Sequence, residues 1–368
     1  MLGATQSNPM LNGARTPIAI VGFRNPGDVL RCLAALARAE REPSFAVFIC
    51  ENGGAAAFDA LAAALAAPGG PCVGRAESVA TASGAFVRAC RLRLGADGPV
   101  VHLGEAKENL GYAGGVNAWA RPLLDVAGWD GLWVLNPDTK PEPNALAELV
   151  GYAERRGKGM VGSRVVFADN PDVIGSRGLR WRRILASPLG VDVGAPASPP
   201  PDPDDVDARI DSPSGVSIYV TRACFERIGL MDERYFLYYE DFDWGLRAKK
   251  ACGVGYAYGS IVPHVGGSTI GSSRRRSERS ELSVYLEFRN RLIFVRRHYP
   301  AWAAWSAAMA CARAGEFLFV GAVENFWAAM RGVRAGLRGE TGRPDHILDR
   351  RAELRTVDDG SRARASRH

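Results

Sequence analysis

The arrangement of the first fifty residues constrains the fold more than any other feature of the chain. The apolar run Thr16 to Phe23 predicts a buried strand, and Asp28 can cap a helix whose leucines recur at helical spacing. A second apolar run, Phe45 to Cys50, predicts another strand. Strand, helix and strand in this order indicate a parallel sheet, whose ligand crevice lies at the carboxyl ends of the strands. We therefore predict an α/β fold with Arg24 and Glu51 at that edge.

The remaining segments extend this pattern. Further strands are predicted at 100–103, 131–135, 160–167, 215–220 and 253–258, and further helices at 141–155, 222–228 and 281–297. Residues 55–98 are rich in alanine and predict helix, interrupted at 68–71. The polar, proline-rich segment 196–213 predicts a solvated loop, of the length that usually forms a lid or is disordered.

Two loops next to these strands contain residue types suited to an anionic ligand. The loop Glu108 to Asn117 holds three glycines ahead of a helix, which suits either a phosphate cradle or an ordinary turn. The strand 131–135 ends at Asn136-Pro-Asp138, where an amide oxygen and a carboxylate suit Mg²⁺ or Mn²⁺, although the same tripeptide also forms a simple turn. His264, in a later glycine-rich loop, is either a ligand or a hydrogen-bonded structural residue.

The stretch Phe236 to Trp244 concentrates acidic and aromatic side chains. Glu240, Asp241 and Asp243 lie within four residues and are surrounded by five aromatic residues. Like charges repel, and aromatic walls desolvate carboxylates, so such crowding favours an acid-base or metal site. The alternative is the acidic first turn of a helix that runs to about Cys252.

Composition excludes several classes of protein. The apolar fraction of 47% is that of a globular protein with a sizeable core. The seven cysteines show no paired spacing, which argues against a zinc site or a disulfide framework and favours a reducing cytoplasm. Of the net charge of +6, residues 331–368 supply +4, because they hold ten Arg against six Asp or Glu. A nearly neutral body argues against nucleic-acid binding, and the first fifteen residues show no signal peptide.

The C-terminal part predicts helices with an unusual surface. Residues 301–337 are rich in Trp, Phe and Ala, but their charge-free run is shorter than the roughly 20 apolar residues of a membrane span. Either an interfacial helix pair contacts a membrane through its aromatic face, with the basic tail 338–368 on lipid phosphates, or a helical hairpin packs on the domain or in a homodimer.

These pieces in this order resemble the inverting, nucleotide-sugar-dependent glycosyltransferases of family 2, which have the GT-A fold, and within them the rhamnosyltransferase-like branch. The resemblance covers residues 16–300. It is carried by IAIVGFRN, FICENGG, NLGYAGGVN, WVLNPD, the segment SGVSIYVTRACFERIGLMDERYFLYYEDFDWGLR and PHVGGS. It implies a GT-A domain at 16–300 (donor half 16–138, acceptor half 139–300), after a flexible N-terminus at 1–15.

The resemblance also implies roles for individual residues. Donor-binding places fall on Gly22, Phe23, Arg24, Glu51, Asn109, Gly115, Asn117 and Asn136. Asp138, in the place of the family's DxD motif, and His264 would hold the divalent cation. Asp241, beside Glu240, matches the catalytic base. Tyr239 or Trp244 would stack on the acceptor.

The expectation is thus a metal-dependent transferase that moves a sugar, from a donor such as dTDP-rhamnose, to a glycan or lipid-linked acceptor in cell-surface polysaccharide synthesis. It would work in the cytoplasm at the inner membrane face. The alternatives are a GT-A-like protein without turnover, which only docks a nucleotide sugar or a partner, and a dehydrogenase. The dehydrogenase would require a GxGxxG after the first strand, where the chain reads GFRNPG.

Overall fold

A computed structural model describes residues 10–79, 83–266 and 276–348. The chain divides into two units, a sheet unit formed by 1–233 and 239–269 and a helical unit formed by 234–238 and 270–368. Four predicted features lie wholly or partly outside the described residues: the N-terminal residues 1–9, the loop residues Gly267 and Ser268, the basic run Ser272 to Arg275, and the tail beyond residue 348.

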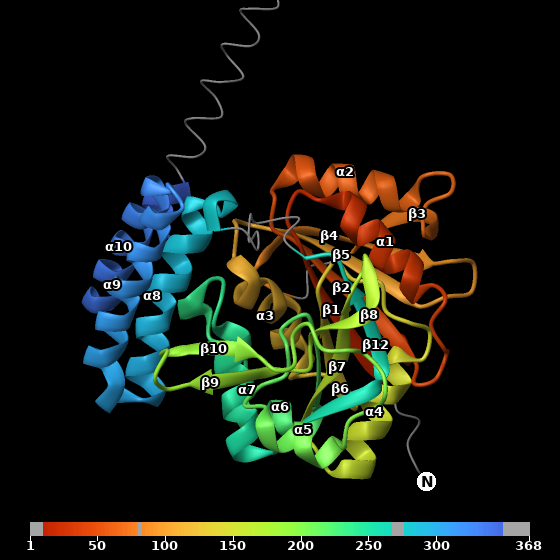
Figure 1. Ribbon diagram of the computed structural model, residues 1–368. Helices are drawn as coiled ribbons and strands as arrows, with labels where there is room; N and C mark the ends of the chain where they lie inside the picture. The colour runs from red at the N-terminus through yellow and green to blue at the C-terminus, as the bar shows by residue number, and fades with distance from the viewer. Residues whose placement is uncertain (1–9, 80–82, 267–275, 349–368) are drawn as a thin grey trace, which may run out of the picture. The chain divides into compact units, whose positions relative to one another are not determined.

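The sheet unit is built on a ten-stranded sheet (Figure 1). Its strand order is β12-β7-β11-β6-β1-β2-β5-β4-β3, and β8 pairs with β7. The strands are β1 Thr16–Gly22, β2 Phe45–Glu51, β3 Cys72–Val79, β4 Phe86–Leu94, β5 Val100–Ala106, β6 Gly131–Leu135, β7 Met160–Phe167, β8 Asn170–Ser176, β11 Ser217–Thr221 and β12 Val254–His264.

Most of these strands run in one direction. The pairs β1 with β2, β1 with β6, β2 with β5 and β7 with β12 are parallel. Strand β11 is antiparallel to both β6 and β7, so these two also share a direction. The predicted fold class, an α/β sheet that is mostly parallel and flanked by helices, is confirmed.

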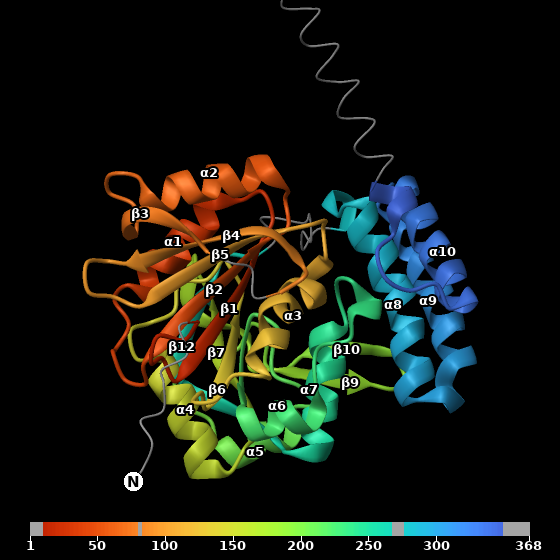
Figure 2. The same ribbon diagram turned by 180° about the vertical axis from the view of Figure 1, so that it is seen from behind.

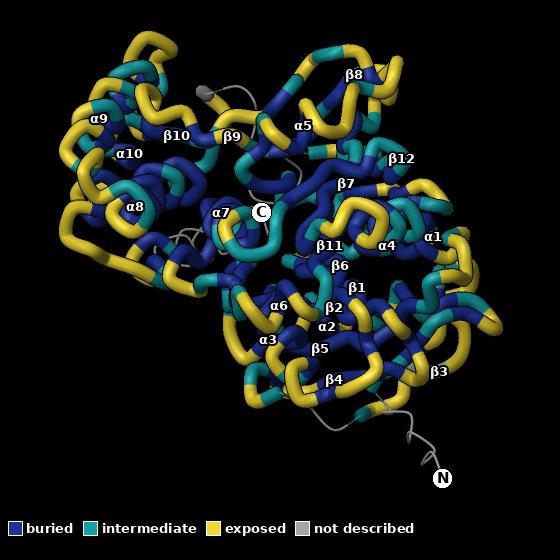
Figure 3. The backbone as a smooth tube through the Cα atoms, turned by 90° about the horizontal axis from the view of Figure 1, so that it is seen from below, coloured by how far each residue is buried: buried dark blue, intermediate teal, exposed yellow. Residues whose placement is uncertain are grey.

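Helices cover both faces of the sheet. Successive side chains of a strand point to opposite faces, so those of β1 enter two different cores. Ile18 and Ile20 belong to one buried cluster, which α1 (Pro26–Leu36), α2 (Ala55–Ala66) and α4 (Ala145–Arg156) complete. Ala19 and Val21 belong to the other, which α3 (Gly111–Leu123), α6 (Arg222–Ile228) and α7 (Glu240–Ala251) complete. The central strands are buried on both sides (Figure 3).

Two segments differ from the sequence-based expectation near the start of the chain. Residues 72–79 and 86–94 form the antiparallel strands β3 and β4, not helix: in β4, Phe86, Leu92 and Leu94 are buried, while Val87, Arg88 and Arg93 are exposed. Residues 10–15 are packed, since Leu11 is buried and Arg15 pairs with Asp130.

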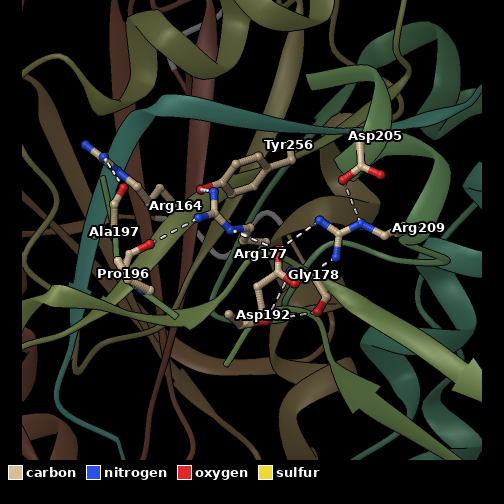
Figure 4. Close-up of polar contacts among 10 residues, drawn as sticks. Arg164, Arg177, Gly178, Asp192, Pro196, Ala197, Asp205, Arg209 and Tyr256 are labelled. Atoms are coloured by element: carbon tan, nitrogen blue, oxygen red, sulfur yellow. Dashed lines mark hydrogen bonds and ion pairs between the residues drawn. The ribbon is translucent and has the colours of Figure 1, made fainter. Parts of the chain in front are cut away.

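The segment predicted as a solvated loop at 196–213 contains a packed helix, α5 (Pro203–Arg209). The side chain of Val206, in the middle of α5, is fully buried. The chain before this segment forms a hairpin of β9 (Leu179–Arg182) and β10 (Ser187–Gly190). Figure 4 shows the ion network beside α5: the buried Arg177 donates to the Tyr256 hydroxyl and pairs with Asp192, which also binds Arg209. These contacts hold in place a segment whose polar, proline-rich sequence predicted a solvated loop.

The helical unit holds α8 (Glu281–His298), a short 3-10 turn at Pro300–Trp302, α9 (Ala303–Phe319) and α10 (Val323–Arg338), which Figure 2 shows from behind. Its core consists of Val284, Phe288, Ala310, Phe317 and Val333 with their neighbours. Helix α8 was expected in the main domain, but its contacts place it here. In the described parts of the chain, no helix is both long and apolar enough to span a membrane.

Candidate active site

The predicted donor and metal residues lie at one edge of the sheet unit. Strands β1, β2, β6 and β12 share a direction. Their carboxyl ends therefore lie on the same edge: Arg24 and Asn136 follow β1 and β6, and Glu51 and His264 are the last residues of β2 and β12. This edge is the ligand crevice of an open α/β sheet.

Asp138 and His264 are brought together by backbone pairing. Residues Thr139 and His264 form an antiparallel bridge, and the amide of Val265 donates to the Asp138 carbonyl at 3.1 Å. His264 Nε2 consequently lies 3.2 Å from Asp138 Oδ1. Burial raises the pKa of Asp138, but the hydrogen bond and charge of His264 and the amide of Gly266 outweigh it and hold that pKa below its usual value. Asp138 is therefore ionised at neutral pH.

The pair suits one shared divalent cation. Adjacent ligands of an octahedral ion with bonds of about 2.1 Å are about 3 Å apart, close to the separation of these two donor atoms. A single carboxylate with phosphates as the remaining ligands is a common Mg²⁺ arrangement. Among the described residues no cluster of three or more His, Cys, Asp or Glu could hold a metal alone, so a cation here would need ligands from the substrate.

Tyr112, which the sequence reading did not single out, connects this edge to the acidic stretch. Its hydroxyl donates to Asn136 Oδ1 at 2.9 Å and lies 3.3 Å from the Gly215 carbonyl oxygen. Burial raises the pKa of Tyr112 well above its usual value, and the negative charges of Glu240, Asp241 and Asp138 raise it further. The phenol thus lies within electrostatic range of all three carboxyl groups.

The acidic pair occupies the first turn of α7. Tyr239, just before the helix, has a left-handed backbone with φ of 75°, which places Glu240 and Asp241 at the helix N-terminus. Asp241 Oδ1 accepts from the Phe242 amide at 2.8 Å. Burial raises the pKa of Asp241, although hydrogen bonds from the amides of Phe242, Asp241 itself and Gly215 oppose the rise.

Gly215 explains how Asp241 can approach the loop before β11. A Cβ atom on residue 215 would lie only 2.2 Å from Asp241 Oδ2. Glycine is thus required there by the close approach of the carboxylate. The loop that carries Gly215 also contacts Tyr112, so the two residues and Asp241 form one connected group.

Glu240 is more deeply buried than its neighbour Asp241. Its side chain is 4% exposed, and within the described chain its Oε2 has no hydrogen-bond partner. Burial, followed by the charge of Asp241, raises the pKa of Glu240 well above its usual value. Burial thus favours the protonated form of Glu240, whereas Asp241 is only partly buried and has amide donors that favour its ionised form.

The predicted base-and-ribose loop is organised by Glu51. Its Oε1 accepts from the amides of Arg24 at 3.0 Å and Gly53 at 2.8 Å, and its side chain is buried. Burial raises the pKa of Glu51, and the two amides partly offset this. One carboxylate oxygen therefore holds the loop. Arg24 is exposed beside the Phe23 ring, and Gly22 is packed against Glu51.

The glycine-rich loop is tied to β2 by Asn52, which sequence reasoning missed. Asn52 Nδ2 donates to the Gly111 carbonyl at 2.8 Å, and Asn109 Oδ1 accepts from the Gly111 amide at 3.0 Å. A Cβ on Gly115 would lie 2.8 Å from the Val21 side chain, so this glycine permits close packing of α3 on β1.

Asn117 differs from its predicted donor-binding role. It is buried, its Nδ2 donates to the Met231 carbonyl and to Glu233, and its Oδ1 accepts from the Met231 amide. Both amide hydrogens are used within the protein. Asn117 thus holds the chain ahead of the acidic stretch and has no donor left for a ligand.

The aromatic residues predicted for the acceptor are both buried. Trp244 is fully buried, its Nε1 donates to the Gly229 carbonyl at 2.8 Å, and its ring packs edge-on against Phe225. It faces the core because it lies on the inner side of α7, so it offers no face to an acceptor sugar. Tyr239 is 6% exposed.

Comparisons with known proteins give one informative match. No family model matches the chain. It is 23% identical over 256 residues to the low-salt glycan biosynthesis hexosyltransferase Agl10 of Haloferax volcanii. The alignment covers 67% of this chain and 79% of that protein. This similarity supports the general class of glycosyltransferase.

Among solved structures, S. aureus TarS 1-349 gives a TM-score of 0.46 at 10% identity, covering 88% of this chain and 83% of that chain. GalNAc-T7 with UDP, GalNAc and Mn²⁺ gives 0.46 at 13% identity, covering 77% and 51%. Both scores are too low to define a fold on their own.

Proposed function

We propose that this chain is a metal-dependent, inverting glycosyltransferase of the GT-A type and family 2, in its rhamnosyltransferase-like branch. It would transfer a sugar from a nucleotide-sugar donor, such as dTDP-rhamnose, to a hydroxyl of a glycan or lipid-linked acceptor in cell-surface polysaccharide synthesis. The observation that carries the proposal is the grouping around Tyr112 of a strand-end Asp138 paired with His264 and of the acidic pair Glu240 and Asp241.

The two acids have different tasks because their surroundings differ. Asp241 is the general base: it takes the acceptor hydroxyl proton as that oxygen bonds to the anomeric carbon. The bond from this carbon to the diphosphate oxygen breaks on the opposite face, and the nucleoside diphosphate leaves. One base and one in-line displacement invert the anomeric centre. Glu240 stays protonated, so a second negative charge does not destabilise ionised Asp241.

The donor edge supplies binding and charge. Asp138 and His264 would hold a Mg²⁺ or Mn²⁺ ion, which when bound supplies Lewis-acid stabilisation of the departing diphosphate. Arg24 is exposed on the loop held by Glu51, where its guanidinium can meet donor phosphate or ribose. Asn136 lies at the same edge, and among the described residues its side chain is engaged only through Oδ1, which accepts from Tyr112; its Nδ2 can therefore donate to the donor sugar nucleotide.

An enzyme that uses a lipid-linked acceptor must reach the membrane surface. We therefore propose that this enzyme acts at the cytoplasmic face of the membrane, which is also the location that the sequence predicted. The homodimer stays a prediction. A GT-A-like protein without turnover would bind the same donor, so binding alone does not separate the two functions.

The decisive experiment combines donor identification with turnover. Purified protein would be screened by thermal shift against UDP-, GDP- and dTDP-sugars, because a saturating ligand raises the melting temperature. With the best donor, release of nucleoside diphosphate would be measured in Mg²⁺ or Mn²⁺. We expect Asp241→Asn to abolish release without loss of donor binding, and Asp138→Ala or His264→Ala to weaken metal-dependent donor binding. Donor binding without any turnover would indicate the docking protein instead.

A further inference from the structure

The outer surface of α9 in the helical unit carries no charged side chain. Its exposed residues fall on one side of the helix, where the half-buried Gly315 fills the gap before the last two: Ala304, Trp305, Ala308, Cys311, Ala312, Leu318 and Phe319. The two charged residues of α9, Arg313 and Glu316, are not fully exposed. A surface helix normally presents polar residues to water, so this stripe lacks its ordinary composition.

The stripe continues into the turn that leads to α10. Phe319 is 91% exposed at the end of α9, and Val320 and Val323 in and after the turn are also exposed. Every exposed Trp or Phe within the described residues lies between positions 302 and 327, from the 3-10 turn before α9 into α10: Trp302, Trp305, Phe319 and Trp327. Single exposed apolar residues are ordinary, but aromatic residues gathered on one helix pair mark an interaction surface.

Helix α10 adds basic charge to the same hairpin. Val323, Trp327, Arg331, Arg334 and Arg338 follow at intervals of three or four and are all exposed. Near the turn the stripe is apolar, with the exposed Glu324 beside it. Beyond Trp327 it is basic, with Arg331 paired to Glu281 at 2.7 Å and Arg338 at 4.0 Å from Glu340.

We propose that the outer face of α9, the α9–α10 turn and the exposed stripe of α10 form a docking surface for a bilayer of anionic phospholipid. Trp and Phe side chains enter the boundary between headgroups and acyl chains, where amphipathic aromatic rings are favoured. The arginines of α10 lie at headgroup phosphates. A second copy of the chain fits this surface less well for two reasons. Phe319 projects from the turn and is nearly fully exposed, and a symmetric pairing of two such surfaces would bring their arginines together.

The proposal concerns the helical unit alone and does not depend on the transfer reaction. Its test is sedimentation of the full chain with vesicles of phosphatidylcholine and with vesicles that also contain phosphatidylglycerol. We expect binding to the anionic vesicles, weakened by salt. The double variant Trp305→Ser/Phe319→Ser should bind at least about tenfold more weakly, because burial of each aromatic ring is lost. Arg334→Gln should weaken binding to anionic vesicles only.

The control variant is Val87→Ser, which removes an exposed apolar side chain from β4 of the sheet unit and should leave vesicle binding unchanged. The variants change exposed side chains, and circular dichroism melting would verify that each is folded. Absence of vesicle binding, or equal binding of the double variant and the parent chain, would overturn the proposal. So would a dimer of the parent chain that the double variant dissociates without any vesicle binding, because the surface would then join two copies.

Discussion

Replacing Gly215 by alanine should displace Asp241 and leave the fold intact. The added Cβ would lie 2.2 Å from Asp241 Oδ2, whereas ordinary contact begins at 3.4 Å. The carboxylate must therefore move by the difference, about 1.2 Å, because its neighbour is now a methyl group. The φ angle of residue 215 is not positive, so alanine adds no backbone strain of its own.

The magnitude follows from this displacement. A misplacement of about 1 Å in a reacting group costs on the order of 100-fold in rate, which is about 2.7 kcal/mol of activation free energy. The same movement costs folding much less, since an off-rotamer side chain destabilises by about 0.5–1.5 kcal/mol. We therefore expect kcat to fall about 100-fold while the melting temperature changes little.

The assay is release of nucleoside diphosphate in the presence of acceptor, together with donor binding by calorimetry and thermal melting. Gly315→Ala is the matched control, because no atom lies within 4 Å of the added Cβ and the residue is within a helix. It should keep full activity. If Gly215→Ala is folded, binds donor and turns over like the parent chain, Asp241 is not the base whose position sets the rate.

Three further outcomes test two residues of the site and one buried residue of the helical unit. Tyr112→Phe should lower kcat and reduce the free energy of unfolding by about 1 kcal/mol, because the bond to Asn136 is lost; unaltered kcat would remove Tyr112 from the site. Glu240→Gln should keep most activity at neutral pH, since Glu240 is already neutral. Its raised pKa means that the parent chain loses stability as pH rises from the ordinary glutamate pKa through the raised one, so the melting temperature of the variant should gain on that of the parent across this range and keep a constant lead above it; parallel melting curves across pH would contradict this. Asn290→Ala should lower the free energy of unfolding by about 3 kcal/mol in urea titrations, because its buried amide donates to the carbonyls of Tyr235, Leu237 and Tyr238; a loss near zero would show that these carbonyls find other donors.

Local pattern was sufficient for most elements of the sheet unit. The strand predicted at 131–135 and the helix at 222–228 have the predicted bounds, because their apolar residues and flanking turns are explicit in the sequence. Strand β4 was missed: its alternation of buried and exposed residues was read as part of an alanine-rich helix. Helix α5 was missed because its seven residues are mostly polar. Val206 and Asp207 are its buried residues, and Ile210, just after the helix, is also in the core.

The sequence by itself determined which residues end parallel strands, and so placed Asn136, Asp138 and Glu51 at one edge. It also offered, as the alternative to an acid-base or metal site, that the acidic residues form the first turn of a helix, and α7 begins at Glu240. The tertiary structure alone decided which of these side chains face a ligand and which face the core. Trp244 and Asn117 were drawn inward by packing across long sequence separations, whereas Tyr112 and Gly215 came next to the acids. Such contacts cannot be read from the order of residues in the chain, because the burial of a side chain depends on which other element packs against that face of its helix or strand.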